Sequence, residues 1–248
     1  MGHAFEGETE AEVDATPEQI WAAIATGPGA DSWFMGTNHV EPGPGGTVRT
    51  LFGAYRGESL ITGWDPPHRL AYGSEPAPDG RFMAYEFLIE GRGGGSTVLR
   101  LVTSGFLPGD DWETEYDAMT KGGALFFATL RAYVEHFAGR TATPVTAFGP
   151  IVADWGRTWA ALRGRLGLGD DVKPGQTVRF TPGGLAPIDG VVYFVNEHTL
   201  GIRTDDAIYR FLRGLHGPMV AAHHIFTRID EQTTQGAWES WLTGLERG

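Results

Sequence analysis

The sequence predicts an α+β fold, in which a curved antiparallel sheet wraps round a long helix and a second, reduced α+β domain of similar type follows. Two observations carry this prediction. A series of short strands, separated by glycine- and proline-rich turns, follows a first strand and a short helical region. The segment 112–137 then closes the series, with apolar residues at helical spacing.

The chain begins with a surface strand and a capped helix. Residues 5–13 alternate strictly, with glutamate at every even position from 6 to 12, which is typical of a strand with one solvent face. Thr16, Pro17 and Gln19 then form a helix start, as N-cap, first-turn proline and capping-box partner. We expect this helix to end at the Gly-Pro-Gly of 27–29, with a second short helix over 30–34.

The strands of the sheet follow from residue 45 onward. Those expected are 47–54, 58–64, 68–72, 81–90 and 97–104. In the fourth, Met83, Tyr85, Phe87 and Ile89 share one face. A sheet curved round the long helix leaves a gap between the two, and we expect inward aromatic side chains and the helix pair Gly122-Gly123 to line it.

The order and spacing of these elements resemble a known family. The matching segments are Thr16-Pro-Glu-Gln-Ile-Trp21, Asp31-Ser-Trp-Phe34, Gly45-Gly-Thr-Val-Arg49, Trp64-Asp-Pro-Pro-His-Arg69 and Tyr133-Val-Glu-His-Phe-Ala-Gly-Arg140. Together they resemble the START-related SRPBCC superfamily and, within it, the activator-of-heat-shock-protein-ATPase homologues. The resemblance covers about residues 5–140 and implies a helix-grip fold with a cavity between sheet and final helix. It implies no catalytic residue, because the family shares no catalytic motif that could be matched here.

The second half repeats the first imperfectly. Residues 141–151 have the composition of a linker, which predicts a helix-grip domain over 1–140 and a smaller domain over 152–248. The repeated segments are Trp21-Ala-Ala-Ile24 with Trp159-Ala-Ala-Leu162, and Pro44-Gly-Gly-Thr-Val-Arg49 with Pro174-Gly-Gln-Thr-Val-Arg179. We expect a degenerate duplicate without a clear first strand. This arrangement is similar to two-domain actinobacterial-type members of the family.

The charge and the absence of cysteine exclude some classes of partner and of chemistry. Residues 1–140 hold 20 acidic and 9 basic side chains, which disfavours nucleic acid and anionic lipid surfaces. The sequence has no cysteine, so disulfides and thiolate chemistry are excluded. No apolar run is long enough to span a membrane, and the first residues lack an apolar leader. We expect a bacterial, cytoplasmic protein, with a monomer and a homodimer both left open.

The expected ligand-binding side chains are aromatic and thioether groups on the inner faces of sheet and long helix, with Trp33 near the mouth of the cavity. They are Trp33, Phe52, Tyr72, Met83, Tyr85, Phe87, Tyr116, Met119 and Phe127. Plain core packing is the alternative for each. The tyrosines favour a pocket, because a buried hydroxyl needs a partner and a ligand can be that partner.

No metal and no organic cofactor is expected. His223 and His224 are neighbours on a predicted strand, so their side chains point to opposite faces and cannot share one ion. His198 and His216 fall in loops, without ligand spacing between them. No glycine-rich turn leads from a strand into a helix, as a dinucleotide site would require. We expect one histidine of the strand pair to face the interior of the second domain.

Three classes of function remain open. The first is binding of a small apolar molecule in the gap, without assigned chemistry. The second is a cofactor-independent enzyme of the cyclase, dehydratase or hydrolase kind, in which Tyr85, Tyr116, His223 or His224 would move protons. The third, implied by the family name, is a stress- or chaperone-associated interaction module, although no residue here can be matched to a chaperone-binding surface.

Overall fold

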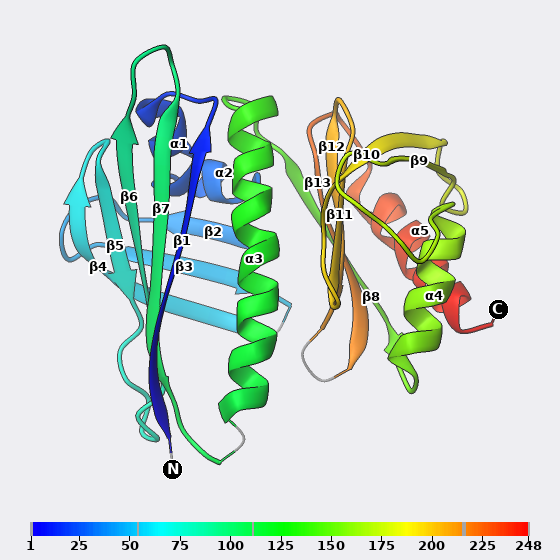
Figure 1. Ribbon diagram of the computed structural model, residues 1–248, viewed down its shortest axis with the longest axis horizontal. Helices are drawn as coiled ribbons and strands as arrows, with labels where there is room; N and C mark the ends of the chain where they lie inside the picture. Colours follow the sequence, from blue (N-terminus) through cyan, green and yellow to red (C-terminus); the bar gives the residue numbers. More distant parts are fainter. Residues whose placement is uncertain (1, 54, 111, 215–216, 248) are drawn as a thin grey trace. The chain divides into compact units, whose positions relative to one another are not determined.

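The computed structural model describes residues 2–53, 55–110, 112–214 and 217–247. The chain divides into two compact units, Met1–Thr141 and Ala142–Gly248. Each unit is an antiparallel sheet with helices packed against it (Figure 1). The predicted α+β fold is therefore confirmed for both. Among the helices of the described residues, none has the length and apolar character needed to cross a membrane.

The first unit is a seven-stranded sheet in the order β1-β7-β6-β5-β4-β3-β2. Its strands are β1 (His3–Val13), β2 (Thr37–Val40), β3 (Thr47–Phe52), β4 (Tyr55–Asp65), β5 (Arg69–Gly73), β6 (Phe82–Gly91) and β7 (Thr97–Leu107). Its helices are α1 (Pro17–Ile24), α2 (Gly27–Ala30) and α3 (Trp112–His136). Figure 1 shows α3 running along the sheet. The short strand β2 was not expected, because its four residues carry no strong apolar alternation.

The two short helices of this unit differ in how well the sequence predicted them. The capping box at the start of α1 is present: the Thr16 hydroxyl accepts from the backbone of Gln19, whose side chain accepts from the backbone of Thr16. The Gly-Pro-Gly segment was expected to end α1 but instead forms α2, so that expectation was wrong. Thr26 caps α2 by accepting from the Gly29 backbone. A side chain at Gly29 would collide with the carbonyl oxygen of Ala22, so glycine permits the close approach of the two helices.

The second unit is a six-stranded sheet in the order β8-β13-β12-β11-β10-β9. Its strands are β8 (Thr143–Ile151), β9 (Thr177–Phe180), β10 (Ile188–Val195), β11 (Thr199–Arg203), β12 (Ala207–Arg213) and β13 (Pro218–Ile225). Helix α4 (Trp155–Arg165) follows β8, and α5 (Glu231–Thr243) follows β13.

The segment expected to be a linker, 141–151, is mostly strand β8. It pairs with β13 along most of its length and places Val145 and Ala147 in the core. Its threonines and prolines resemble a linker in composition, yet Pro144 is compatible with a strand at the edge of a sheet. This strand is also the first strand that the duplicate was expected to lack.

The two sheets share one topology. In each, the first strand pairs with the last, and the strands between them form a meander, so that β9–β13 correspond to β3–β7. The Gly45 N–H donates to the Ile61 carbonyl (3.0 Å), and the Gly175 N–H donates to the Val192 carbonyl (2.8 Å). Both glycines have positive φ, 81° and 89°. In both sheets the register shifts directly after the acceptor residue. The two units therefore share these local features as well as their strand order.

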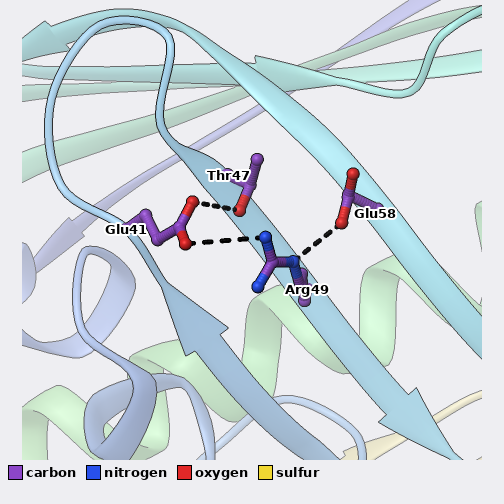
Figure 2. A network of polar contacts seen from close by, with 4 residues as sticks. All are labelled: Glu41, Thr47, Arg49 and Glu58. Carbon is purple, nitrogen blue, oxygen red and sulfur yellow. Dashed lines mark hydrogen bonds and ion pairs between the residues drawn. The ribbon is translucent and has the colours of Figure 1, made fainter.

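A cross-strand ion pair is repeated at the same position. Arg49 Nε lies 2.7 Å from Glu58 Oε2, and Arg49 Nη2 lies 3.5 Å from Glu41, whose other oxygen accepts from Thr47 (Figure 2). In the second unit the corresponding pair joins Arg179 of β9 to an aspartate of β10 at 3.4 Å. The repeated Thr-Val-Arg segment thus occupies the same strand in both sheets.

Placing a charge in β8 tests whether this segment is a strand of the core. Ala147 is fully buried, whereas Ile151 at the end of the same strand is 74% exposed. We expect Ala147→Asp to lower the free energy of unfolding by about 3–5 kcal/mol, because the carboxylate would be buried without a partner. The matched variant Ile151→Asp should stay within about 0.5 kcal/mol of the wild type in chemical denaturation. Equal stability of both variants would mean that 141–151 is a linker after all.

Candidate ligand site

The inner face of the first sheet carries an aromatic row on β5 and β6. The register places Tyr72 opposite Tyr85 and Leu70 opposite Phe87, so these side chains share one face. The ring centroid of Tyr72 lies 5.5 Å from that of Tyr85 and 6.3 Å from that of Phe87. Phe87 is buried and both tyrosines are half-buried. The structure thus brings together three of the side chains expected to line the gap.

Neither tyrosine hydroxyl in this row makes a hydrogen bond to a described residue. Burial raises the pKa of Tyr72 and of Tyr85, and a neighbouring tyrosine adds to each effect. Among the described side chains, the polar atoms that are enclosed without a partner are Arg163 Nε, His223 Nε2 and Trp238 Nε1. The two hydroxyls are therefore not sealed in packing but reach open space. At neutral pH both stay protonated and act as donors.

Tyr55 extends the aromatic row onto β4, and the sequence analysis missed it. A Cβ at Gly57 would meet the Tyr55 ring, so the phenol lies over that glycine on the inner face. The side chain is 59% exposed, and its electrostatic effect contributes to the raised pKa of Tyr85. The sequence did contain a signal, because Tyr55, Gly57, Ser59 and Ile61 have the two-residue spacing of one strand face. The strand was expected to begin only at residue 58.

A second aromatic group lies at the start of α3. The ring of Tyr116 is 5.2 Å from Phe5 and 6.3 Å from Trp112, and His3 stacks on Trp112 at 3.9 Å. This group borders an open hollow of about 340 Å³, which is lined by His3, Ala4, Phe5, Glu6, Trp112, Glu113 and Tyr116. Tyr116 was expected to oppose Tyr85 across the gap. Its ring contacts are with β1 and with its own helix, so the two tyrosines belong to different groups.

Two glycines mark open space between β1 and α3. Gly7 lies on the inner face of β1, on the same side as Phe5, and Gly123 lies on the stripe of α3 that also holds Tyr116 and Phe127. A Cβ at either glycine would meet no atom within 4 Å, and both residues are exposed. A filled core would have closed this space to the density of an organic crystal. The space beside both glycines is therefore not filled by described side chains of the sheet or of α3.

The remaining expected residues of sheet and helix are half-buried or buried. Phe52 pairs with Tyr55 at the tip of the β3–β4 hairpin and is half-buried. Met83 precedes the aromatic row on β6 and is also half-buried. On α3, Met119 is half-buried and Phe127 is buried.

Trp33 lies elsewhere than expected. It is buried, and its indole Nε1 donates to the carbonyl oxygen of Ala23 at 2.9 Å. Its ring is 5.3 Å from Phe34, which is in turn 5.0 Å from Phe126 of α3. Trp33 therefore packs among the helices instead of standing at a mouth, because its single donor finds a backbone acceptor there.

The two strand histidines of the second unit point to opposite faces, as their spacing predicts. His223 faces α5: its ring is 4.2 Å from Trp238 and 5.0 Å from Tyr209. The Arg210 backbone N–H donates to His223 Nδ1 (3.2 Å), so the ring proton sits on Nε2. His224 Nε2 lies 2.6 Å from Arg210 Nη2. Burial lowers the pKa of Arg210 to about 10.

Metal-ligating side chains do not gather in the part of the chain that the structure describes: no group of three or more from His, Cys, Asp and Glu could hold an ion there. His216, one of the loop histidines considered above, lies outside the described residues. His198 lies close to Glu197 and to the Arg213 guanidinium.

The environment of His223 predicts acid sensitivity of the second unit. Burial, followed by the nearby Arg210 charge, lowers the His223 pKa well below its usual value. The unfolded chain therefore binds a proton below pH about 6.5 that the folded chain does not, so stability present at pH 7 is lost as the pH falls. We expect the free energy of unfolding to fall between pH 6.5 and 5 by up to about 1.4 kcal/mol per pH unit from this group.

Denaturation of matched variants across this pH range measures that contribution. His223→Gln should flatten the slope, because the titrating group is gone. The exposed His39 supplies the control, since His39→Gln should leave the slope unchanged. If His223→Gln and the wild type lose stability in parallel, the acid sensitivity lies in other groups.

Fold and site together define a helix-grip protein with open space between its first sheet and its long helix. The family model described as "Activator of Hsp90 ATPase homolog 1-like protein" matches residues 14–135. The first unit, which holds the whole matched stretch, belongs to this family. No curated protein matches the chain.

Among the solved structures of low identity that are similar to the chain, some cover nearly all of it and others cover about half of it. The di-domain ARO/CYC BexL from the BE-7585A biosynthetic pathway is 15% identical, with 98% of this chain and 95% of that chain covered and a TM-score of 0.49. DynU16, a putative protein in the dynemicin biosynthetic locus, is 17% identical, with 97% and 95% covered and a TM-score of 0.44. The Aha1 dimer from Colwellia psychrerythraea is 20% identical, with 53% and 96% covered and a TM-score of 0.43.

Proposed function

We propose that the first unit binds one small, mainly apolar molecule in the space between its sheet and α3. The observation that carries this proposal is the pair of half-buried tyrosines, Tyr72 and Tyr85, whose hydroxyls bond to none of the described residues and reach open space. A hydroxyl that reaches open space takes its hydrogen-bond partner from water or from a bound molecule, and two such donors side by side on an apolar face favour a ligand that carries an acceptor. The open space at Gly7 and Gly123 gives this molecule room.

Binding fits the chemistry of the tyrosine pair better than proton abstraction does. The pKa of each phenol is raised, so neither is an effective base near neutral pH. The inner faces of β4–β7 supply no carboxylate or imidazole among the described residues that could remove a proton in their place. A reaction would need both a positioned base and an acid at one spot.

The second unit is not expected to hold a second molecule. The rings of Phe180, Phe211, Trp238 and Trp241 contact one another between its sheet and α5, and all four are buried. A hollow of about 390 Å³ lies beside Trp241, lined by Arg165, Thr181, Gly183, Ser240 and Trp241. Trp241 is itself buried, so its ring separates this hollow from the core. One ligand per chain follows.

Filling the space beside α3 tests the proposal. Gly123→Leu adds a side chain where no atom lies within 4 Å, and it replaces a residue that weakens a helix by about 0.8–1 kcal/mol. We expect the variant to be as stable as the wild type or more so, yet to bind the neutral fluorophore N-phenyl-1-naphthylamine at least ten-fold more weakly. Fluorescence titration of the wild type should saturate at one fluorophore per chain.

The matched control is Gly236→Leu in α5, where a Cβ also meets nothing within 4 Å. It makes the same change in the final helix of the other unit and should leave binding intact. A wild type that binds no fluorophore, or a Gly123→Leu variant that binds it as well as the wild type does, would contradict the proposal.

A further inference from the structure

The first sheet separates charged from uncharged side chains by face. The strand register assigns alternate residues of all seven strands to the inner face, and every one from β4 to β7 is uncharged. On these four strands the inner polar groups are the indole N–H of Trp64 and the hydroxyls of Tyr55, Ser59, Tyr72, Tyr85, Thr97 and Thr103. A molecule lying against this face would meet rings, aliphatic groups and hydroxyls, and no counter-charge.

The charged residues of the strands instead pair with one another on the outer face. Arg100 of β7 lies 3.3 Å from Glu8 and 2.7 Å from Glu10 of β1, and Arg69 of β5 lies 2.5 Å from Glu86 of β6. The Arg49 network of Figure 2 continues this pattern across β3 and β4. These arginines therefore form ion pairs on the outer face and do not supply a positive charge to the proposed site.

Charges at the border of the inner face are also engaged. Arg81, just before β6, pairs with Glu115 of α3. The Asp31 carboxylate accepts from the backbone (2.6 Å) and side chain (3.1 Å) of Asn38, while burial raises its pKa. Residues 1–140 hold 20 acidic and 9 basic side chains, so the field around this unit also repels anions.

We propose that the ligand of this site is an uncharged molecule with an aromatic-sized apolar body and a hydrogen-bond acceptor, such as a carbonyl oxygen, held by the Tyr72 and Tyr85 hydroxyls. This inference rests on the proposed function and adds the chemical class of the ligand. The ring centroids of the two tyrosines are 5.5 Å apart on neighbouring strands, so a single acceptor or two adjacent ones could meet both donors.

The physical reason is the cost of desolvation. An ionised group moved from water to an apolar surface loses its hydration, and only a paired counter-charge makes up for that loss. An acceptor oxygen loses less, and two preplaced donors replace its water contacts. Because burial raises the pKa of both phenols, they stay protonated and act as donors at neutral pH.

Three naphthalene fluorophores of similar size separate charge from hydrogen bonding. N-Phenyl-1-naphthylamine is neutral, 8-anilinonaphthalene-1-sulfonate is the same body with an anionic group, and 2-acetyl-6-(dimethylamino)naphthalene is neutral with a carbonyl acceptor. We expect the wild-type full chain to bind both neutral compounds at least ten-fold more tightly than the sulfonate. The emission of the bound carbonyl compound should show the red shift of a hydrogen-bonded carbonyl.

The double variant with Tyr72→Phe and Tyr85→Phe keeps both rings and removes both hydroxyls. We expect it to bind the carbonyl compound about five- to ten-fold more weakly, with emission moved to shorter wavelength, and to bind N-phenyl-1-naphthylamine within two-fold of the wild type. Tyr209→Phe makes the same change in the second unit and should alter the affinity for neither compound. A thermal melt of each variant shows that it is folded.

The outcomes distinguish the inference from the proposed function. The wild type could bind the sulfonate as tightly as its neutral counterpart and lose both in Gly123→Leu. That result would overturn the inference that the ligand is uncharged but would leave the proposed site in place. Unchanged affinity and emission of the carbonyl compound in the double variant would remove the tyrosine pair as its recognition element. Failure of all three compounds to bind the wild type would overturn the proposed function itself.

Discussion

The proposed site depends on two phenol hydroxyls that have no hydrogen-bond partner among the described residues and that lie on an uncharged face of the sheet. Tyr72 and Tyr85 are held side by side by the β5–β6 register, with their ring centroids 5.5 Å apart. The sheet can present such a face because its charged residues are drawn into ion pairs on the other side. A helix that carries glycine at the middle of its sheet-facing stripe leaves the space beside them open.

The second unit shows what the same topology becomes when that space is filled. It keeps the strand order, the glycine turn with positive φ, the register shift and the cross-strand ion pair. Its final helix is shorter, however, and packs Trp238 against His223 and Trp241 against Phe211 of the sheet. Large rings stabilise a small core through the apolar area they bury. The second unit thus has large rings between its sheet and α5, with His223 buried among them.

The sequence predicted the features that depend on local pattern. Parity along β6 correctly placed Tyr85 and Phe87 on one face, and the repeated Pro-Gly-x-Thr-Val-Arg segment correctly located equivalent strands. Residue spacing and repeated segments could not reveal the features that depend on tertiary contacts. No pattern shows that the Trp33 indole meets the Ala23 carbonyl. The composition of β8 concealed a strand whose place is fixed by β13.

Xenon binding in crystals tests the central claim most directly, because xenon enters open apolar space and leaves packed cores empty. A crystal of the full chain under xenon pressure should show xenon between the Tyr85 row and Gly123 of the first unit, and none among Phe211, Trp238 and Trp241. Side chains of α3 packed directly on Tyr72 and Tyr85, with no xenon between them, would contradict the account.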